Sequence, residues 1–195
     1  MRKVLLVVLL SGLFGLLGPG SAAAKEHDGK PMTVQAAIAD AETALDNGRL
    51  GDAINESERL QRTRGLTKDE QGRLEVIIGR CKLVTGKFAE SEKLLARRVK
   101  LSPDDTRLSE WYARALDGNG KSDAALRLLG DLAKKDALQE GDSYWALAQL
   151  ERKKGENDAA RAHAKLALEK PIVLQSDEME KEIHQFIDEL TPKKK

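Results

Sequence analysis

Four glycines recur along the chain at a near-constant interval, each inside the same local pattern. They are Gly48, Gly86, Gly120 and Gly155, spaced 38, 34 and 35 residues apart. Each glycine ends one amphipathic stretch of helical periodicity, and a second such stretch begins two or three residues later. A period of this length is typical of stacked helix-turn-helix units rather than of one globular core.

The residues around these glycines fill the same offsets in successive copies. In the second copy Gly79 precedes Gly86 by seven residues, Phe88 follows it by two, and Leu95 and Pro103 come later. The third copy contains Ala113, Ala125, Leu129 and Leu132. The fourth contains Ala148, Ala160, Ala164, Ala167 and Pro171. The first copy is the weakest and contains Leu50, Ala53 and Leu60. The pattern resembles the tetratricopeptide repeat (TPR), a helix-turn-helix unit of about 34 residues. The resemblance covers roughly residues 34–172 and implies an all-α fold, a right-handed superhelical α-solenoid.

Turn and capping signals divide this region further. We expect four repeats at about 34–66, 67–105, 106–140 and 141–172, a capping helix at 173–190 and a basic tail at 191–195. Thr67 and Glu70 predict a capping box. Ser102, Pro103, Asp104 and Asp105 predict a helix with a serine N-cap and a proline in its first turn. The capping helix has Met179, Ile183, Phe186, Ile187 and Leu190 on one face, as a solenoid end requires.

The first 24 residues have the pattern of a signal peptide. Arg2 and Lys3 precede an apolar run at 4–17, and a Gly-Pro-Gly break and three alanines precede Lys25. A membrane-spanning helix needs about 20 apolar residues, so this run is short for a permanent anchor. We expect an exported protein of the bacterial-envelope type, periplasmic or secreted, with a flexible segment at 25–33. The alternative is an uncleaved leader that anchors the chain to the inner membrane.

The net charge and the lack of catalytic motifs in the sequence restrict the functions that the chain can have. The net charge is +1, and loss of Arg2 and Lys3 brings it to −1, which favours neither nucleic acid nor an anionic membrane surface. No paired histidines, phosphate-binding glycine loop or nucleophile elbow occurs. We therefore expect no enzyme, no catalytic residue, no metal site and no cofactor. Cys81, the one cysteine, lies in an apolar helical series and is expected to be buried.

The resemblance also indicates where a ligand would bind. In TPR proteins the first helices of successive repeats line a concave face, and the ligands are usually extended peptides. Alignment on the glycines places these residues on that face: Gln35, Ile38, Glu42 and Leu45; Arg73, Val76, Arg80, Leu83 and Val84; Arg107, Glu110, Arg114 and Asp117; Asp142, Trp145, Gln149, Arg152 and Lys153.

Four arginines recur on this face at both helical and repeat spacing. Arg73 and Arg80 are seven residues apart, and Arg107 and Arg114 repeat the pair 34 residues later. The guanidinium group suits carboxylates, so the four predict a basic ladder for an acidic or carboxylate-terminated peptide. A solvated face balanced by neighbouring acids is the other interpretation. The candidate peptide-binding residues are Arg73, Val76, Arg80, Leu83, Arg107, Arg114, Trp145 and Arg152.

The order of these residues departs from the Lys/Asn pattern of TPR proteins that clamp the C-terminal carboxylates of chaperones, so that function does not carry over. The sequence predicts a non-catalytic protein–protein interaction module or scaffold of the cell envelope, with another protein or peptide as partner. The alternative is a constitutive structural or assembly subunit of a larger envelope complex. A hydrophobic, arginine-poor concave face would favour that alternative.

Overall fold

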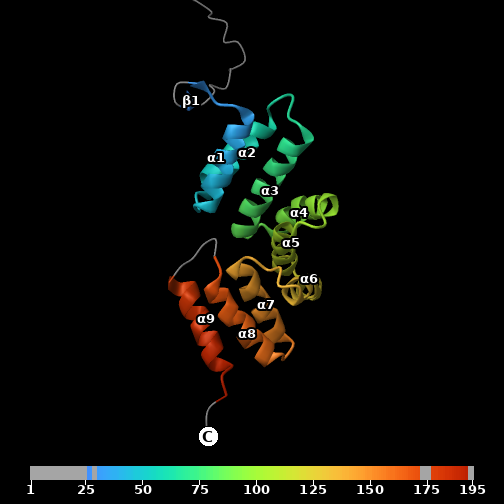
Figure 1. Cartoon of the computed structure of the whole chain (residues 1–195), viewed down its shortest axis with the longest axis vertical. Helices are drawn as coiled ribbons and strands as arrows, with labels where there is room; N and C mark the ends of the chain where they lie inside the picture. Colours follow the sequence, from blue (N-terminus) through green and yellow to red (C-terminus); the bar gives the residue numbers. More distant parts are fainter. Residues whose placement is uncertain (1–25, 28–29, 172–176, 193–195) are drawn as a thin grey trace, which may run out of the picture. The chain divides into compact units, whose positions relative to one another are not determined.

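A computed structural model describes residues 26–27, 30–171 and 177–192 (Figure 1). The chain divides into two compact units, residues 1–32 and residues 33–195. The expected signal peptide at 1–24 lies outside the described residues. In the described part of the first unit, β1 (Glu26–His27) and β2 (Lys30–Pro31) form a two-residue antiparallel pair with Glu26 opposite Pro31.

The second unit is an all-α solenoid of helix-turn-helix repeats, which confirms the expected fold class (Figure 1). The repeats are the pairs α1 (Val34–Asp46) and α2 (Leu50–Gln61), α3 (Lys68–Val84) and α4 (Phe88–Leu101), α5 (Thr106–Gly118) and α6 (Ser122–Lys134), and α7 (Gly141–Lys153) and α8 (Asn157–Glu169). Each first helix packs on its own second helix and on the next first helix, and α9 (Asp177–Glu189) packs on α8. Each of the four expected repeat ranges holds one helix pair.

The recurring glycines end the four first helices in the left-handed conformation, with φ between 72° and 82°. The turn at Gly120 is representative. Its N–H donates to the Asp117 carbonyl at 2.9 Å, and the N–H of Lys121 donates to the Leu116 carbonyl at 2.8 Å. This is the Schellman arrangement, which satisfies the last carbonyls of a helix and favours glycine because no Cβ opposes a positive φ.

Small side chains let the two helices of a repeat approach closely. A Cβ atom at Gly79 would lie 2.9 Å from Cδ2 of Leu95, so this position of α3 has no room for a side chain. Ser91 Oγ donates a hydrogen bond to the Gly79 carbonyl oxygen at 2.8 Å. The later repeats place fully buried alanines at the equivalent points, among them Ala113, Ala125, Ala148 and Ala160. The repeats therefore stack on short side chains, as their sequence pattern predicted.

The capping predictions have different outcomes. Thr67 and Glu70 form the expected capping box at the start of α3. The prediction for Ser102 and Pro103 is wrong, because α5 begins at Thr106 and Asp105 is its N-cap, with Oδ1 accepting from the Leu108 N–H at 2.9 Å. Residues 102–105 instead form a turn, closed by a hydrogen bond from the Asp105 N–H to the Ser102 carbonyl at 3.2 Å.

The capping helix and the cysteine agree with expectation. The apolar series of α9 packs on the core of the last repeats, where Ile183 and Phe186 are buried. Cys81 is 1% exposed, and burial raises the pKa of its thiol to about 11. A thiol held in its neutral form is a poor nucleophile, so Cys81 acts here as a small core residue. Among the described helices, none combines the length and apolar character needed to cross a membrane.

Candidate functional site

The two ladder arginines of the second repeat are paired with acids of the first. Arg73 contacts Glu42 through two hydrogen bonds, Nε to Oε1 at 3.0 Å and Nη2 to Oε2 at 2.6 Å. Arg80 Nη2 lies 3.1 Å from Asp46 Oδ1. Both pairs join α3 to α1, so they connect the first helices of adjacent repeats.

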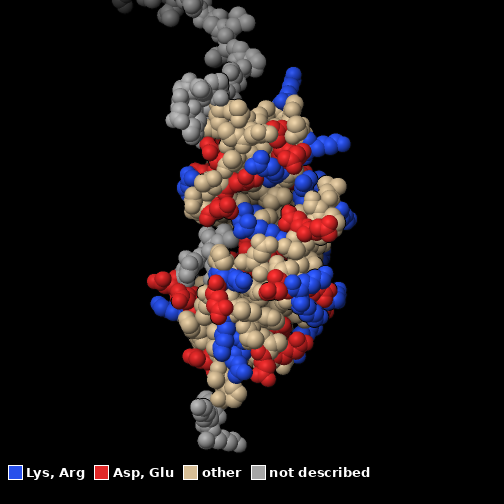
Figure 2. Space-filling model, in the orientation of Figure 1, with Lys and Arg blue, Asp and Glu red and all other residues tan. Residues whose placement is uncertain are grey.

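The two ladder arginines of the third repeat instead face the start of the fourth. Arg114 donates to Glu140 at 3.0 Å and lies 3.2 Å from Asp142 Oδ1, while Arg107 Nε lies 3.6 Å from Glu140 Oε1. All four ladder arginines therefore have a carboxylate partner in a neighbouring repeat or in the loop that leads to it. Figure 2 shows the same balance on a larger scale, with acidic and basic side chains interspersed over the visible face.

A buried polar cluster lies at the junction of the third and fourth repeats. Glu140 is 3% exposed and accepts hydrogen bonds from Trp111 Nε1 at 2.8 Å and from Arg114. Glu110 is 0% exposed and accepts from the backbone N–H groups of Gln139, at 2.8 Å, and Glu140, at 3.1 Å. Burial raises the pKa of Glu110, although these hydrogen bonds partly oppose the shift. The cluster ties the chain entering α7 to α5.

Five residues expected on the concave face are buried; Leu83 and Trp145 line the pockets described below, but the assignment of the other three to that face was wrong. Ile38 and Leu45 are fully buried where α1 packs on α2 and α3, and Glu110 is buried in the polar cluster. A first helix contacts both its own second helix and the next first helix, which leaves only a narrow strip of its surface open.

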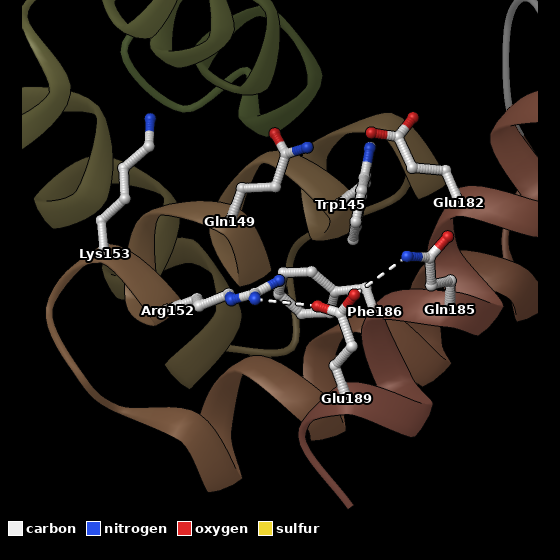
Figure 3. A pocket seen from close by; sticks show the side chains of 8 residues that line it. All are labelled: Trp145, Gln149, Arg152, Lys153, Glu182, Gln185, Phe186 and Glu189. Carbon is white, nitrogen blue, oxygen red and sulfur yellow. Dashed lines mark hydrogen bonds and ion pairs between the residues drawn. The ribbon is translucent and has the colours of Figure 1, made fainter.

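A pocket of about 500 Å³ lies between α7 and α9, and we call it the α7–α9 pocket (Figure 3). Its lining residues are Trp145, Gln149, Arg152 and Lys153 from α7, and Glu182, Gln185, Phe186 and Glu189 from α9. These four residues of α7 are the ones that the glycine alignment placed on the concave face in the fourth repeat, except for Asp142. They share one side of the helix because Trp145, Gln149 and Lys153 are spaced by four residues and Arg152 follows Gln149 by three.

Two aromatic side chains form the floor of the α7–α9 pocket. The rings of Trp145 and Phe186 meet edge to face, with centroids 4.8 Å apart and planes at 79°. The Arg152 guanidinium stacks 4.9 Å from the centroid of Phe186 and donates to Glu189 Oε2 at 2.8 Å. Gln185 Nε2 donates to Glu189 Oε1 at 2.9 Å, so the polar groups on this side are fixed by one another.

The other polar groups of this pocket have no partner among the described residues. Lys153, Glu182 and Gln149 make no ion pair or side-chain hydrogen bond there, and the indole N–H of Trp145 donates to none of these residues. An aromatic floor with a few unpaired polar groups is typical of sites that bind an apolar side chain and orient it by hydrogen bonds.

A second pocket, of about 270 Å³, lies among α3, α4, α5, α7 and α9, and we call it the α3–α7 pocket. Its lining residues are Leu83, Val84, Phe88, Arg114, Asp117, Gly118, Asp142, Ala146 and Met179. Of the eight candidate residues, Leu83 and Arg114 line this pocket, and Trp145 and Arg152 line the α7–α9 pocket. The other four, Arg73, Val76, Arg80 and Arg107, line neither of these two pockets.

The sequence interpretation missed the contribution of α9 to the site. The sequence predicted only a capping helix in this region, whereas Glu182, Phe186 and Glu189 line the α7–α9 pocket. The interval of 37 residues between the paired Arg152 and Glu189 is close to the repeat period and could have indicated that α9 takes the place of a fifth first helix. Glu140 was missed because it precedes α7 and so lies outside the helical spacing by which the candidate residues were chosen.

Metal-binding geometry is not found in the part of the chain that the structure describes. No group of three or more His, Cys, Asp or Glu side chains is arranged there to hold an ion. His163 Nδ1 lies 2.8 Å from Glu151 Oε2, and His184 Nε2 lies 3.9 Å from Glu180 Oε1, as pairs within the solenoid.

Comparison with known proteins identifies similar folds. The sequence matches no protein-family profile and no curated protein. A tetratricopeptide repeat protein from Parabacteroides merdae superposes with a TM-score of 0.59 at 15% identity, covering 81% of this chain and 59% of that one. A mutant of MamA gives 0.55 at 18% identity, with 80% of each chain covered. MamA AMB-1 gives 0.55 at 19% identity, covering 79% of this chain and 84% of that one. At these identities the likeness concerns the fold alone, and that fold is the TPR-like helical solenoid.

Proposed function

We propose that the chain is a non-catalytic protein-interaction module that holds an extended segment of a partner along its first helices. The α7–α9 pocket carries this proposal, because an aromatic floor there is combined with polar groups that the protein itself leaves unpaired. The α3–α7 pocket adds a more apolar cavity on the same series of helices. Proteins that are similar in fold commonly bind peptides along this face.

Reversible binding is better supported than permanent assembly. Among the described residues, Leu101 is the one large hydrophobic side chain that is strongly exposed, and it lies at the end of α4, outside both pockets. Interfaces of permanent complexes are larger and more apolar than transient ones. The open polar rim of the α7–α9 pocket suits a ligand that exchanges with water.

Site-specific photocrosslinking tests this function. A photoreactive residue replaces Gln149 in the α7–α9 pocket or, as a control, the exposed Lys165 on α8. After irradiation in the native envelope, we expect a discrete crosslinked partner at position 149 and none at position 165. Equal labelling at both positions, or none at position 149, would contradict the proposed binding face.

The chain is further proposed to act after export, in the periplasm or outside the cell. The support is the sequence pattern of residues 1–24, with its basic start, short apolar run and alanine-rich junction. N-terminal sequencing of the native protein should begin at or near Lys25, and the protein should be extracted without detergent. Recovery of Met1 or Arg2 on membrane-embedded material would instead support the anchored alternative.

A further inference from the structure

The two helices that form the α7–α9 pocket run parallel to each other, so the two ends of the pocket can be told apart. Trp145 contacts Phe186, and seven residues later on α7 Arg152 contacts both Phe186 and Glu189. Later residues of α7 thus meet later residues of α9, so the two helices run in the same sense. The ion pair places Arg152 and Glu189 at the same level along the two helices. Counting back seven residues on each helix then places Trp145 at the level of Glu182.

This register separates the two unpaired charges along the pocket. Glu182 lies at the level of Trp145, and Lys153 lies eight residues further along α7. At 1.5 Å per residue the axial separation is about 12 Å. Figure 3 shows the same arrangement, with Lys153 and Glu182 on opposite sides of Trp145. Phe186, four residues after Glu182 on α9, lies between these two levels.

The charges of the pocket cancel overall but not locally. Arg152 and Glu189 neutralise each other through their 2.8 Å contact. The remaining pair, Lys153 and Glu182, is too far apart to do so, and each therefore favours a ligand group of the opposite sign at its own end. A uniformly acidic or uniformly basic segment would satisfy one end and be repelled at the other.

An extended peptide matches these distances. Its backbone advances about 3.3 Å per residue, so about four residues of a peptide that runs along the two helices cover this axial separation. A side chain midway between them would lie at the level of Gln149 and Phe186, one turn of α7 from Trp145. The Gln149 amide and the indole N–H of Trp145 remain for hydrogen bonds to the peptide backbone.

We propose that the α7–α9 pocket binds an extended partner segment with an aromatic residue at its centre, a basic residue two positions to one side and an acidic residue two positions to the other. The basic side chain lies at Glu182 and the acidic side chain at Lys153. This inference rests on the proposed function and specifies the partner of the same site. It replaces the acidic ligand expected from the arginine ladder by one of mixed charge.

Capped pentapeptides with a fluorescent label test the proposal by anisotropy with the purified chain. The reference probe has the order lysine, serine, phenylalanine, serine, glutamate. Three matched probes replace phenylalanine with alanine, glutamate with lysine, or lysine with glutamate. We expect the alanine probe to bind about ten-fold more weakly than the reference, and each like-charged probe about three-fold more weakly.

Charge reversal in the protein gives the sharper test. Lys153→Glu should make the two-lysine probe the best ligand, and Glu182→Lys should do the same for the two-glutamate probe. Lys165→Glu and Glu169→Lys reverse exposed charges on α8, outside the pocket, and should leave the ranking of the probes unchanged. Circular dichroism and the melting temperature establish that each variant is folded.

The outcomes separate this inference from the function on which it rests. A reversed ranking in both pocket variants supports the proposal, and an unchanged ranking overturns it. If no probe binds while photocrosslinking at position 149 still captures a partner, the mixed-charge ligand is wrong and the binding face stands. If neither probe nor partner is found at this pocket, both proposals fail.

Discussion

The guanidinium of Arg80 stacks on the indole ring of Trp111, with Cζ 4.2 Å from the ring centroid. The same arginine pairs with Asp46, and the same indole donates to Glu140. A continuous series of polar and aromatic contacts therefore runs from the first repeat to the start of the fourth. These side chains connect one repeat to the next along the stacking direction, while alanines and glycines allow the helices beneath them to pack closely.

Arg80 should therefore contribute more to stability than Arg73, although both form ion pairs with α1. The Arg80 side chain is 11% exposed and also covers Trp111, whereas that of Arg73 is 34% exposed. We expect Arg80→Ala to lower the free energy of unfolding by about 1–2 kcal/mol. Arg73→Ala should cost less than about 1 kcal/mol. Urea denaturation at low and high salt measures both. Equal losses would contradict a special role for the stacked contact.

At the junction of the third and fourth repeats, Glu140 should be the acid whose replacement destabilises the fold most. Its replacement by alanine leaves the Trp111 N–H without an acceptor, although Arg114 keeps its contact with Asp142. We expect a loss of about 2–3 kcal/mol, because a buried donor without a partner pays its full desolvation cost. Asp46→Ala removes a carboxylate that is 62% exposed and serves as the control, with a loss below about 1 kcal/mol. A comparable loss in the two variants would disprove this account.

The buried Glu110 should make stability depend on pH. Burial raises the pKa of its carboxyl above the ordinary value of 4.5. The folded carboxyl holds its proton more tightly than the unfolded one, so its contribution to stability is fully present below the unfolded pKa and is lost as pH rises through the folded pKa.

Because other carboxyls shift the opposite way, a difference measurement isolates Glu110. Glu92, for example, has a lowered pKa because Lys121 and Asn119 donate hydrogen bonds to it. The free energy of unfolding of the wild type minus that of Glu110→Gln should fall as pH rises from about 4.5 and then level off. A flat difference across this range would show that Glu110 does not titrate differently in the folded state.

Ala125 tests the nearest-neighbour character of the solenoid. It is fully buried within α6, and leucine at this position should overpack the helix contact by about 1–3 kcal/mol. In a repeat array the damage is passed to adjoining units. Hydrogen exchange should therefore quicken in α7 and α8 as well as in the third repeat. Faster exchange confined to residues 104–136 would indicate that the repeats are energetically independent.

Asp136 offers a route to higher stability. It ends α6 with φ of 51°, and the N–H of Ala137 donates to the Leu132 carbonyl at 2.9 Å, as in the glycine turns. Glycine adopts this conformation without steric cost, so Asp136→Gly should raise the free energy of unfolding by up to about 1 kcal/mol. The melting temperature should rise with it. Gly120→Ala is the converse change and should lower it. If both changes act in the same direction, backbone conformation is not the cause.

The parts of the fold that were predictable are those that depend on neighbours in sequence. A Schellman turn is complete within six residues, so the recurrence of Gly48, Gly86, Gly120 and Gly155 was enough to place the ends of the first helices. The turn after α4 was misread because Ser102 and Pro103 suit both a helix start and an isolated turn. Local chemistry did not distinguish the two.

The site was only partly predictable because its contacts join residues 26–41 positions apart. Side-chain spacing correctly grouped Trp145, Gln149, Arg152 and Lys153, which share one helix. It could not show that Arg114 reaches forward to Glu140 while Arg80 reaches back to Asp46, since that depends on the rotation between successive repeats. The same rotation decides that Phe186 comes to face Trp145.

The repeats share an outline, but no two of the junctions between them are bonded in the same way. The first two repeats meet through Arg73 and Glu42, the third and fourth through a buried carboxylate cluster, and the fourth meets α9 through Arg152, Phe186 and Glu189. A copy inserted or moved to another place would meet a neighbour that lacks its counterpart. The side chains at the junctions therefore favour the present order of the repeats over any rearranged one.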